Sequence, residues 1–178
     1  ETFTQEVIPF NGSNRTISFT AFCVNGEIKT FWMGIKLREH PLQFGTATFC
    51  ESVYQQECLD ASRPLLMALR FNGVCEIEYL RDPRDDKFKL IEINARTWLW
   101  VGLAAACGVN YPIYMYNHVN GIKTDFPSSY NVGVYWRNFW TDTIFSSLAI
   151  LKGKLKIADY IRSLHGNVVI DAVRDRDD

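Results

Sequence analysis

The amino-acid sequence predicts an α+β fold, with a mainly antiparallel sheet and flanking helices. Two observations carry this prediction. Short runs of alternating apolar and polar residues follow one another along the chain, and short turns join them, as in an antiparallel sheet. Longer segments between them repeat apolar residues at spacings of three and four, as amphipathic helices do.

The strands are predicted from period-two alternation and turn residues. Asn25-Gly26 separates two alternating runs and is a dipeptide typical of tight hairpin turns. The predicted strands are residues 3–8, 17–23, 28–37, 47–51, 74–80, 88–94, 132–136 and 168–170.

The helices are predicted at residues 53–71, 97–108, 111–119, 141–151 and 157–164. The first of them contains Pro64. A proline inside a helix removes a backbone hydrogen bond and kinks the helix. Pro64 therefore either kinks this helix or begins a second helical piece as its first residue.

The hairpin formed by residues 74–80 and 88–94 is the most informative stretch. Side chains alternate between the two faces of a strand. Folding the hairpin about Asp85 sets Glu78 opposite Glu92 and Glu76 opposite Asn94, all on one face. The same register pairs Leu80 with Leu90, Tyr79 with Ile91 and Ile77 with Ile93.

This register predicts a cation site. Cβ atoms directly opposite in an antiparallel pair lie about 5 Å apart, and like charges there repel. Three carboxylates and an amide oxygen converge with no Lys or Arg nearby in the hairpin strands. Mg²⁺ prefers such oxygen ligands and removes the repulsion. The alternative is an acidic face that only water contacts.

Composition excludes several classes of protein. The chain has 178 residues, 47% hydrophobic, with a net charge of −1, which favours one globular domain and gives no basic footprint for nucleic acid. No apolar run approaches the ~18 residues of a membrane span. Five scattered cysteines without a C-x-x-C pair indicate buried thiols in a reducing cytoplasm rather than a zinc site.

The segment from Gly73 to Arg96, with Glu76 and Glu78 on one strand and Leu90-Ile-Glu-Ile-Asn94 on the next, resembles the metal-binding signature of the ATP-grasp superfamily. The resemblance is closest to carbamoyl-phosphate-synthase-like proteins, with D-aspartate ligase as a relative. It covers about residues 1–121 and implies the C-terminal lobe of an ATP-grasp fold. Residues 122–178 are then a variable α/β extension. The small lobe of the superfamily precedes this region, so we expect a fragment of a longer protein.

The resemblance also implies roles for individual residues. Glu78, Glu92 and Asn94 correspond to ligands of Mg²⁺ (or Mn²⁺), and Glu76 is an additional acidic residue for a second metal or for orienting the amine. Arg96 and Arg38 correspond to catalytic cations at the transferred phosphate or the activated carboxylate. The nucleotide-binding residues implied are Gln5, Glu6, Val7 and Ile8 at the adenine and Lys36 at the phosphates. Without the resemblance, residues 3–8 read as an edge strand, and Lys36 and Arg38 as solvated cations on one face of their strand.

The implied activity is an ATP-dependent carboxylate–amine ligase that acts through an acyl phosphate. Its substrates are then a small carboxylate and an amine, with no nucleic-acid or membrane partner. Two alternatives remain open. One is a degenerate, non-catalytic nucleotide-binding module, and the other is an unrelated α+β domain that binds a ligand through its aromatic residues.

Overall fold

The computed structural model describes residues 4–12, 14–41, 45–165 and 169–171. Seven strands form one sheet in the order β5-β4-β1-β2-β3-β6-β7, antiparallel except for the parallel pair β6 and β7. The strands are β1 (Thr16–Val24), β2 (Glu27–His40), β3 (Thr46–Ser52), β4 (Gly73–Asp82), β5 (Lys87–Asn94), β6 (Tyr135–Arg137) and β7 (Val169–Asp171). The helices are α1 (Gln56–Ala68), α2 (Val101–Ala106), α3 (Tyr111–Val119), α4 (Phe139–Leu151) and α5 (Ile157–Ser163).

The predicted fold class is therefore confirmed. The Asn25-Gly26 turn is present between β1 and β2, and both residues have positive φ, as a type I′ turn requires. The prediction for α3 matches residue for residue, whereas the strand expected at 132–136 is confined to Tyr135–Arg137. The helix expected at 97–108 is likewise shorter, at Val101–Ala106.

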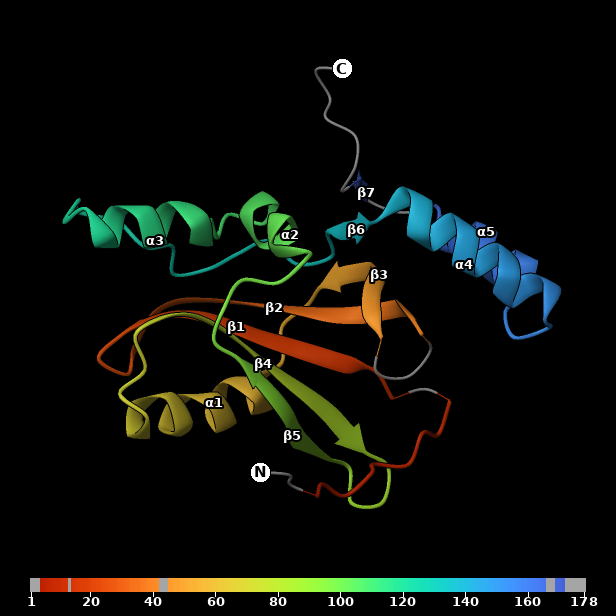
Figure 1. The fold of residues 1–178 in the computed structure, drawn as a ribbon, viewed down its shortest axis with the longest axis horizontal. Coiled ribbons are helices and arrows are strands. Elements are labelled where there is room, and N and C mark those ends of the chain that lie inside the picture. Colours follow the sequence, from red (N-terminus) through yellow and green to blue (C-terminus); the bar gives the residue numbers. More distant parts are fainter. Residues whose placement is uncertain (1–3, 13, 42–44, 166–168, 172–178) are drawn as a thin grey trace.

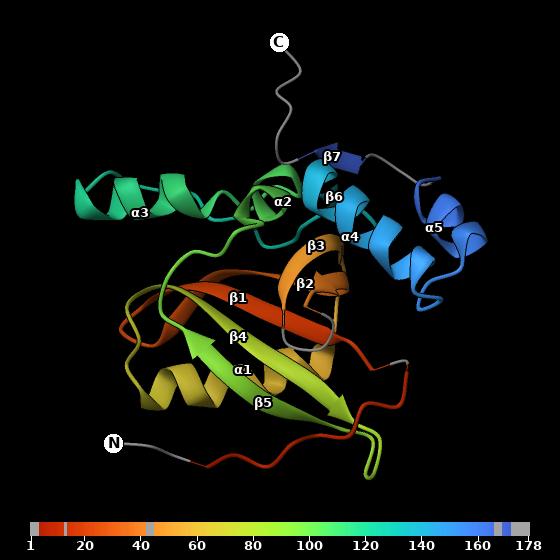
Figure 2. The same ribbon diagram turned by 45° about the vertical axis from the view of Figure 1, so that its right-hand side comes forward.

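The strand predicted at residues 3–8 is wrong for the described residues 4–8, which have no regular secondary structure; Phe3 lies outside the described part. The segment runs beside β5 without joining its ladder (Figures 1 and 2). A side-chain hydrogen bond connects the segment to β5: Gln5 Nε2 donates to the Ile91 carbonyl oxygen at 3.2 Å. Pro9, which follows, has no N–H to extend a ladder.

Helix α1 settles the alternatives for Pro64, because a single helix from Gln56 to Ala68 contains it. The helix stays intact because its buried face packs on β1 and β2, and Ser62 forms a hydrogen bond with Tyr79 of β4. Cys58, Leu59 and Leu66 are buried there against Phe19 and Ile77. Tertiary packing therefore outweighs the local cost of proline, about 3 kcal/mol.

Helices cover both faces of the sheet (Figures 1 and 2). Helix α1 lies on one face, over an apolar cluster that includes Phe19 and Ile77. Helices α2 and α3 lie on the other face, over an aromatic cluster that includes Trp32, Trp98, Trp100 and Tyr111. Helices α4 and α5 extend beyond the β3–β6 end of the sheet. Over the remaining part of this face, on β4, β1 and β2, no helix of the described residues lies (Figures 1 and 2).

All five cysteines are free thiols and buried. In the described ranges, every helix is too short or too polar to cross a bilayer. The division at residues 121 and 122 stays a prediction, and β6 of the predicted extension pairs directly with β3 of the preceding part.

Candidate functional site

The β4–β5 hairpin places the predicted carboxylates together. Glu78 pairs with Glu92, Ile77 with Ile93 and Glu76 with Asn94, as the sequence predicts. The Glu78–Glu92 and Glu76–Asn94 pairs lie on the face of the sheet opposite α1, whereas Ile77 lies on the face that α1 covers. The central part of the predicted register is thus confirmed.

The register nearer the turn is different. A bulge between Glu78 and Tyr79 sets Tyr79 opposite Leu90, so the predicted pairs Tyr79–Ile91 and Leu80–Leu90 are wrong. The turn is the physical reason. The Asp86 N–H donates to the Asp82 carbonyl at 2.8 Å and Asp86 has a φ of 57°, which makes Asp82 and Lys87 the closing pair. Folding about Asp85 leaves one residue too many on β5, and the bulge absorbs it.

Hydrogen bonds join three of the four predicted ligands. The Asn94 Nδ2 donates to Glu92 Oε1 at 2.6 Å and to Glu76 Oε2 at 3.3 Å. Glu76 is only 3% exposed, and among the described residues its buried Oε1 has no hydrogen-bond partner. The neighbouring Ser18 Oγ on β1 is also buried and has no hydrogen bond of ordinary geometry within the described residues, but it lies near enough to Glu76 to lower the pKa of that carboxyl.

Lys36 lies within this cluster, which corrects the expectation that no cation is nearby. Its Nζ lies 2.7 Å from Glu78 Oε1, and the two side chains are only 9% and 12% exposed. Burial alone lowers the pKa of Lys36, but the charge and hydrogen bond of Glu78 outweigh it and raise that pKa. Lys36 is therefore protonated at neutral pH.

The cluster nevertheless keeps a surplus of negative charge. Burial, together with the charge of Glu78, raises the pKa of Glu76 to about 7. Three carboxylates face one ammonium group, and the most buried carboxylate carries the unmet acceptor oxygen. The position of Ser18 beside this cluster could have been predicted from the sequence. Thr16, Ser18 and Thr20 alternate along β1 and lie on the same face as Glu76 and Glu78.

The donor chemistry suits a hard divalent cation. Carboxylate and amide oxygens are the ligands Mg²⁺ and Mn²⁺ take, and the orphaned Glu76 Oε1 is an acceptor that a cation satisfies. Within the described residues, no three His, Cys, Asp or Glu side chains are already grouped around one point as a metal site. Glu78 is turned to Lys36 and Glu92 to Asn94, so cation binding requires these side chains to change partners.

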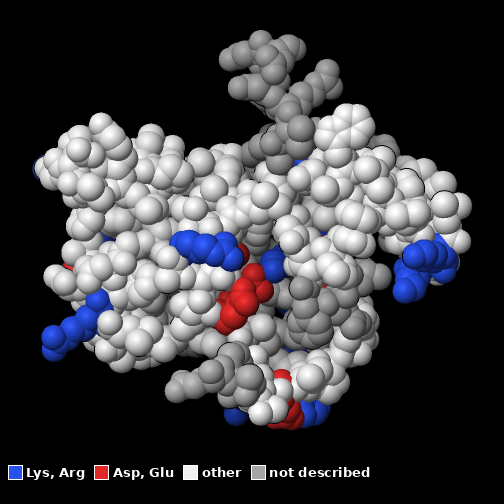
Figure 3. Space-filling view, viewed as in Figure 1, with Lys and Arg blue, Asp and Glu red and all other residues white. Residues whose placement is uncertain are grey.

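The cluster lines a pocket of about 450 Å³. Figure 3 shows acidic side chains gathered in a hollow near the middle of the molecule, with basic side chains beside them. Its lining includes Thr16, Lys36, Glu39, Glu76, Glu78, Leu80, Glu92, Asn94, Arg96, Trp98 and Trp100. Trp98 and Trp100 belong both to the core and to the pocket wall, and the part of the chain that the structure describes offers no acceptor to the buried Trp98 Nε1.

Arg96 is exposed at the rim of this pocket. Its Nη1 donates to the Thr97 carbonyl oxygen at 3.1 Å, and no ion pair ties it to a carboxylate among the residues described. A guanidinium at this rim is available to an anion that enters the pocket.

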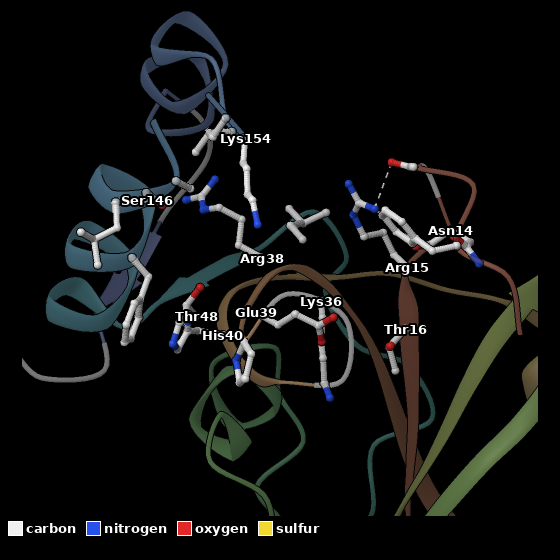
Figure 4. A pocket seen from close by; sticks show the side chains of 18 of the residues that line it. Asn14, Arg15, Thr16, Lys36, Arg38, Glu39, His40, Thr48, Ser146 and Lys154 are labelled. Atoms are coloured by element: carbon white, nitrogen blue, oxygen red, sulfur yellow. Dashed lines mark hydrogen bonds between the residues drawn. The ribbon is translucent and has the colours of Figure 1, made fainter. Parts of the chain in front are cut away.

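Arg38 points elsewhere. A register shift between Lys36 and Arg38 places the two side chains on different sides of β2, so the expectation that they share a face is wrong. Arg38 makes a bidentate pair with Asp142 of α4, with both N–O distances 2.7 Å, and it also donates to Ser163 Oγ of α5. Figure 4 shows Lys36 and Arg38 pointing in opposite directions. Asp142 has no local motif that would have revealed its role.

The predicted adenine segment runs beside the edge strand β5. Ile8 is buried and lines a second pocket, Val7 is 73% exposed, and Glu6 pairs with Arg84 of the β4–β5 turn. Gln5 is bonded to Ile91. Of these four residues, only Ile8 therefore presents its side chain to a pocket.

The second pocket has a volume of about 650 Å³ and adjoins the first. The two share Thr16, Lys36, Glu39, Pro41 and Leu80. Residues 8–16 form one flank and α4, with the loop after it, forms the other (Figure 4).

Comparisons with known proteins identify the fold. No protein-family model matches the sequence, and no curated protein matches it significantly. Similar solved structures include Rhizobium etli pyruvate carboxylase, with a TM-score of 0.55 and 16% identity over 68% of this chain and 14% of that one. Campylobacter jejuni biotin carboxylase, solved as a β,γ-ATP complex, gives 0.52 and 14% identity over 71% of this chain and 29% of that one.

The biotin carboxylase domain of Hydrogenobacter thermophilus 2-oxoglutarate carboxylase, solved with MgADP and bicarbonate, gives a TM-score of 0.52 and 10% identity over 71% of this chain and 29% of that one. This chain spans less than a third of the length of each of these proteins. Biotin carboxylase domains have the ATP-grasp fold. At this level of identity the likeness is one of fold, and this chain shares that fold.

Proposed function

We propose that this chain is the C-terminal lobe of an ATP-grasp ligase that joins a carboxylate to an amine through an acyl phosphate. The observation that carries the proposal is the acidic cluster of Glu76, Glu78, Glu92 and Asn94 on one face of an ATP-grasp sheet, in which Glu76 is buried and Glu92 is exposed. Structural relatives were solved with β,γ-ATP and with MgADP, which supports the same ligand class here. The proposed compartment is the cytoplasm, because all five cysteines are free.

In this proposal Glu78, Glu92 and Asn94 hold Mg²⁺ or Mn²⁺, with Glu76 as the additional carboxylate. A metal held by these residues would supply positive charge to the phosphates of ATP, which would assist phosphoryl transfer. Lys36, released from Glu78 when a cation takes its place, supplies a positive charge to the phosphates. Arg96 is free at the rim to hold the transferred phosphoryl group or the acyl phosphate oxygens.

The adenine would lie along residues 5–8, where Gln5 and the backbone of Glu6, Val7 and Ile8 would contact the edge of the base. An extended backbone offers both a donor and an acceptor to the edge of the base. The proposal also places phosphate-gripping lysines on a separate small lobe. We therefore expect this chain alone to bind nucleotide weakly and to turn nothing over.

The test is Mg²⁺-dependent binding of a fluorescent ATP analogue, measured with and without EDTA. Glu92→Ala should weaken Mg²⁺-dependent binding about tenfold or more, the effect expected on removing a group that holds a metal. Glu27→Ala is the matched control, because Glu27 is an exposed glutamate at the turn between β1 and β2 and lines neither pocket. If wild type and Glu92→Ala bind the ATP analogue equally, or if EDTA does not change binding, the proposed metal site is wrong.

A second candidate, a non-catalytic nucleotide-binding module, is favoured by one observation. Arg38, one of the two cations implied as catalytic, is committed to Asp142. The two candidates separate on a form of the protein that carries a small lobe. The ligase requires ATP hydrolysis that depends on a carboxylate and an amine, whereas the module binds MgATP and never hydrolyses it.

A further inference from the structure

We propose that the 650 Å³ pocket binds the organic acid that the ligase activates, and that this acid has an apolar body. The inference rests on the proposed function for the word "activates", but the binding of an apolar organic anion can be tested by itself. Three features of the pocket carry it: a fixed wall, a surplus of cations, and an apolar lining.

The wall formed by α4 is held rigidly. The Asp142 carboxylate is completely buried. It accepts hydrogen bonds from Nε and Nη2 of Arg38 and from the Thr48 hydroxyl. The Arg38 guanidinium also stacks on the Phe49 ring, 4.2 Å from its centroid. His40 stacks on Phe145 of α4 with centroids 3.3 Å apart. The pocket between β2 and α4 is therefore part of the packed structure.

The charge of the pocket is positive. Arg15 lines it from the N-terminal flank, and Lys152 and Lys154 line it from the loop after α4. None of these three makes an ion pair within the described ranges, whereas Lys36 and Arg38 are already neutralised by carboxylates. Figure 4 shows Lys154 and Arg15 on opposite flanks of the same opening. Among the described lining residues, Glu39 carries the one carboxylate. A neutral adenosine needs no such cations, but an anion does.

The remaining lining is largely apolar. It includes Ile8, Phe10, Leu80, Phe145, Leu148 and Leu155. A pocket of this size, with apolar walls and a few charged groups, is typical of sites for small organic ligands, about 300–1,000 Å³. The combination selects an organic acid with an aromatic or branched apolar body over a sugar or a highly polar amino acid.

The position suits a substrate of the neighbouring cluster. Thr16, Lys36 and Leu80 line both pockets, so a ligand in the larger one reaches the carboxylate pocket along a continuous surface. Lys36 stands at this junction with its ammonium group 2.7 Å from Glu78. The acid is therefore placed next to the site where the phosphates are proposed to bind.

The experiment is an NMR titration of the chain with a panel of apolar carboxylates, from phenylacetate to 4-phenylbutyrate and branched aliphatic acids, each paired with its neutral amide. Under the proposal at least one acid binds about threefold or more tighter than its amide, and the difference shrinks from 50 to 500 mM salt as screening increases. If every acid binds no better than its amide, the proposal is overturned.

Variants locate the site. Lys152→Glu with Lys154→Glu should abolish the preference for acid over amide. Lys29→Glu with Lys123→Glu is the matched control, with the same change in charge on residues outside both pockets. Acid binding that is lost equally in both double variants reflects net charge alone and overturns the proposal.

Nucleotide binding separates this proposal from the proposed function. The Lys152/Lys154 variant should bind the fluorescent ATP analogue as wild type does. If it loses nucleotide and acid together, and ATP displaces the acid, the pocket belongs to the nucleotide and the inference is wrong. If wild type discriminates the acids but binds no MgATP, the pocket stands and the ligase proposal fails.

Discussion

Two basic residues of β2, Lys36 and Arg38, lie two positions apart and have opposite roles. The Arg38 guanidinium has partners on several sides. It forms a bidentate pair with Asp142, stacks on the Phe49 ring and donates to the Ser163 hydroxyl. Lys36 shares its surroundings with three carboxylates and reaches only one of them, beside an open pocket. The first environment is electrostatically complete, and the second is deficient in positive charge.

The difference teaches where to look for chemistry on this sheet. A charge whose partners are all present within the protein stabilises the fold. A cluster in which a buried acceptor, Glu76 Oε1, has no partner among the described residues can bind a cation or a hydrogen-bond donor from a ligand. A bulge in β2 separates the two environments by turning neighbouring cations to different sides.

The largest effect is expected from breaking the complete pair. Asp142→Ala leaves the Arg38 guanidinium, only 17% exposed, without its carboxylate, and should lower the free energy of unfolding by about 3–5 kcal/mol. Urea denaturation measures the change. Asp159→Ala is the control, because Asp159 pairs with Arg162 at the surface and its loss should change little. A stable Asp142→Ala protein would mean that α4 is held by other contacts.

The next largest effect concerns the deficient cluster and pH. The pKa of Glu76 is raised from 4.5 to about 7, so the folded chain binds a proton more tightly than the unfolded chain. Stability from this group is full below pH 4.5 and falls as the pH rises to about 7. Glu76→Gln should remove that fall and be more stable than wild type at pH 8, by up to about 3 kcal/mol.

The comparison is between unfolding free energies of wild type and Glu76→Gln at pH 5 and pH 8, without divalent ions. Glu27→Gln serves as the control for loss of an exposed glutamate. A difference between wild type and Glu76→Gln that is the same at both pH values would show that Glu76 is not held against ionisation.

A smaller effect is expected at Lys36. Lys36→Met keeps the aliphatic stem but removes the one ammonium group facing Glu78, so carboxylate repulsion should cost about 1–2 kcal/mol in EDTA at low ionic strength. Millimolar Mg²⁺ should recover more stability in this variant than in wild type, because a cation then has no competitor. Thermal denaturation with Mg²⁺ or EDTA measures both. Equal stability of the two proteins in EDTA would contradict the role of Lys36 as counter-ion.

The sequence predicted what depends on alternation within one hairpin. Glu76, Glu78, Glu92 and Asn94 meet as expected because parity fixes which face each side chain takes. The bulges in β5 and β2 escaped prediction because turn geometry and cross-strand packing decide them. A one-residue slip there changed the partners of Tyr79 and turned Arg38 away from Lys36.

Partners far apart in the chain were also beyond the sequence. Arg38 and Asp142 are 104 positions apart, and Lys36 and Glu78 are 42 apart. Neither pair carries a local signature. The fold class followed from local periodicity, whereas the second pocket exists only because α4 returns to the end of β2.

The strand order also has a consequence during synthesis of the protein. Strand β1 lies between β2 and β4, and its residue Thr20 pairs with Glu76. Ribosomes make β1, β2 and β3 before β4, so β1 presents an edge of unpaired backbone N–H and C=O groups until residues 73–82 emerge. The nascent chain is therefore most prone to wrong association over that interval, and the arrival of β4 both protects the edge and completes the acidic cluster.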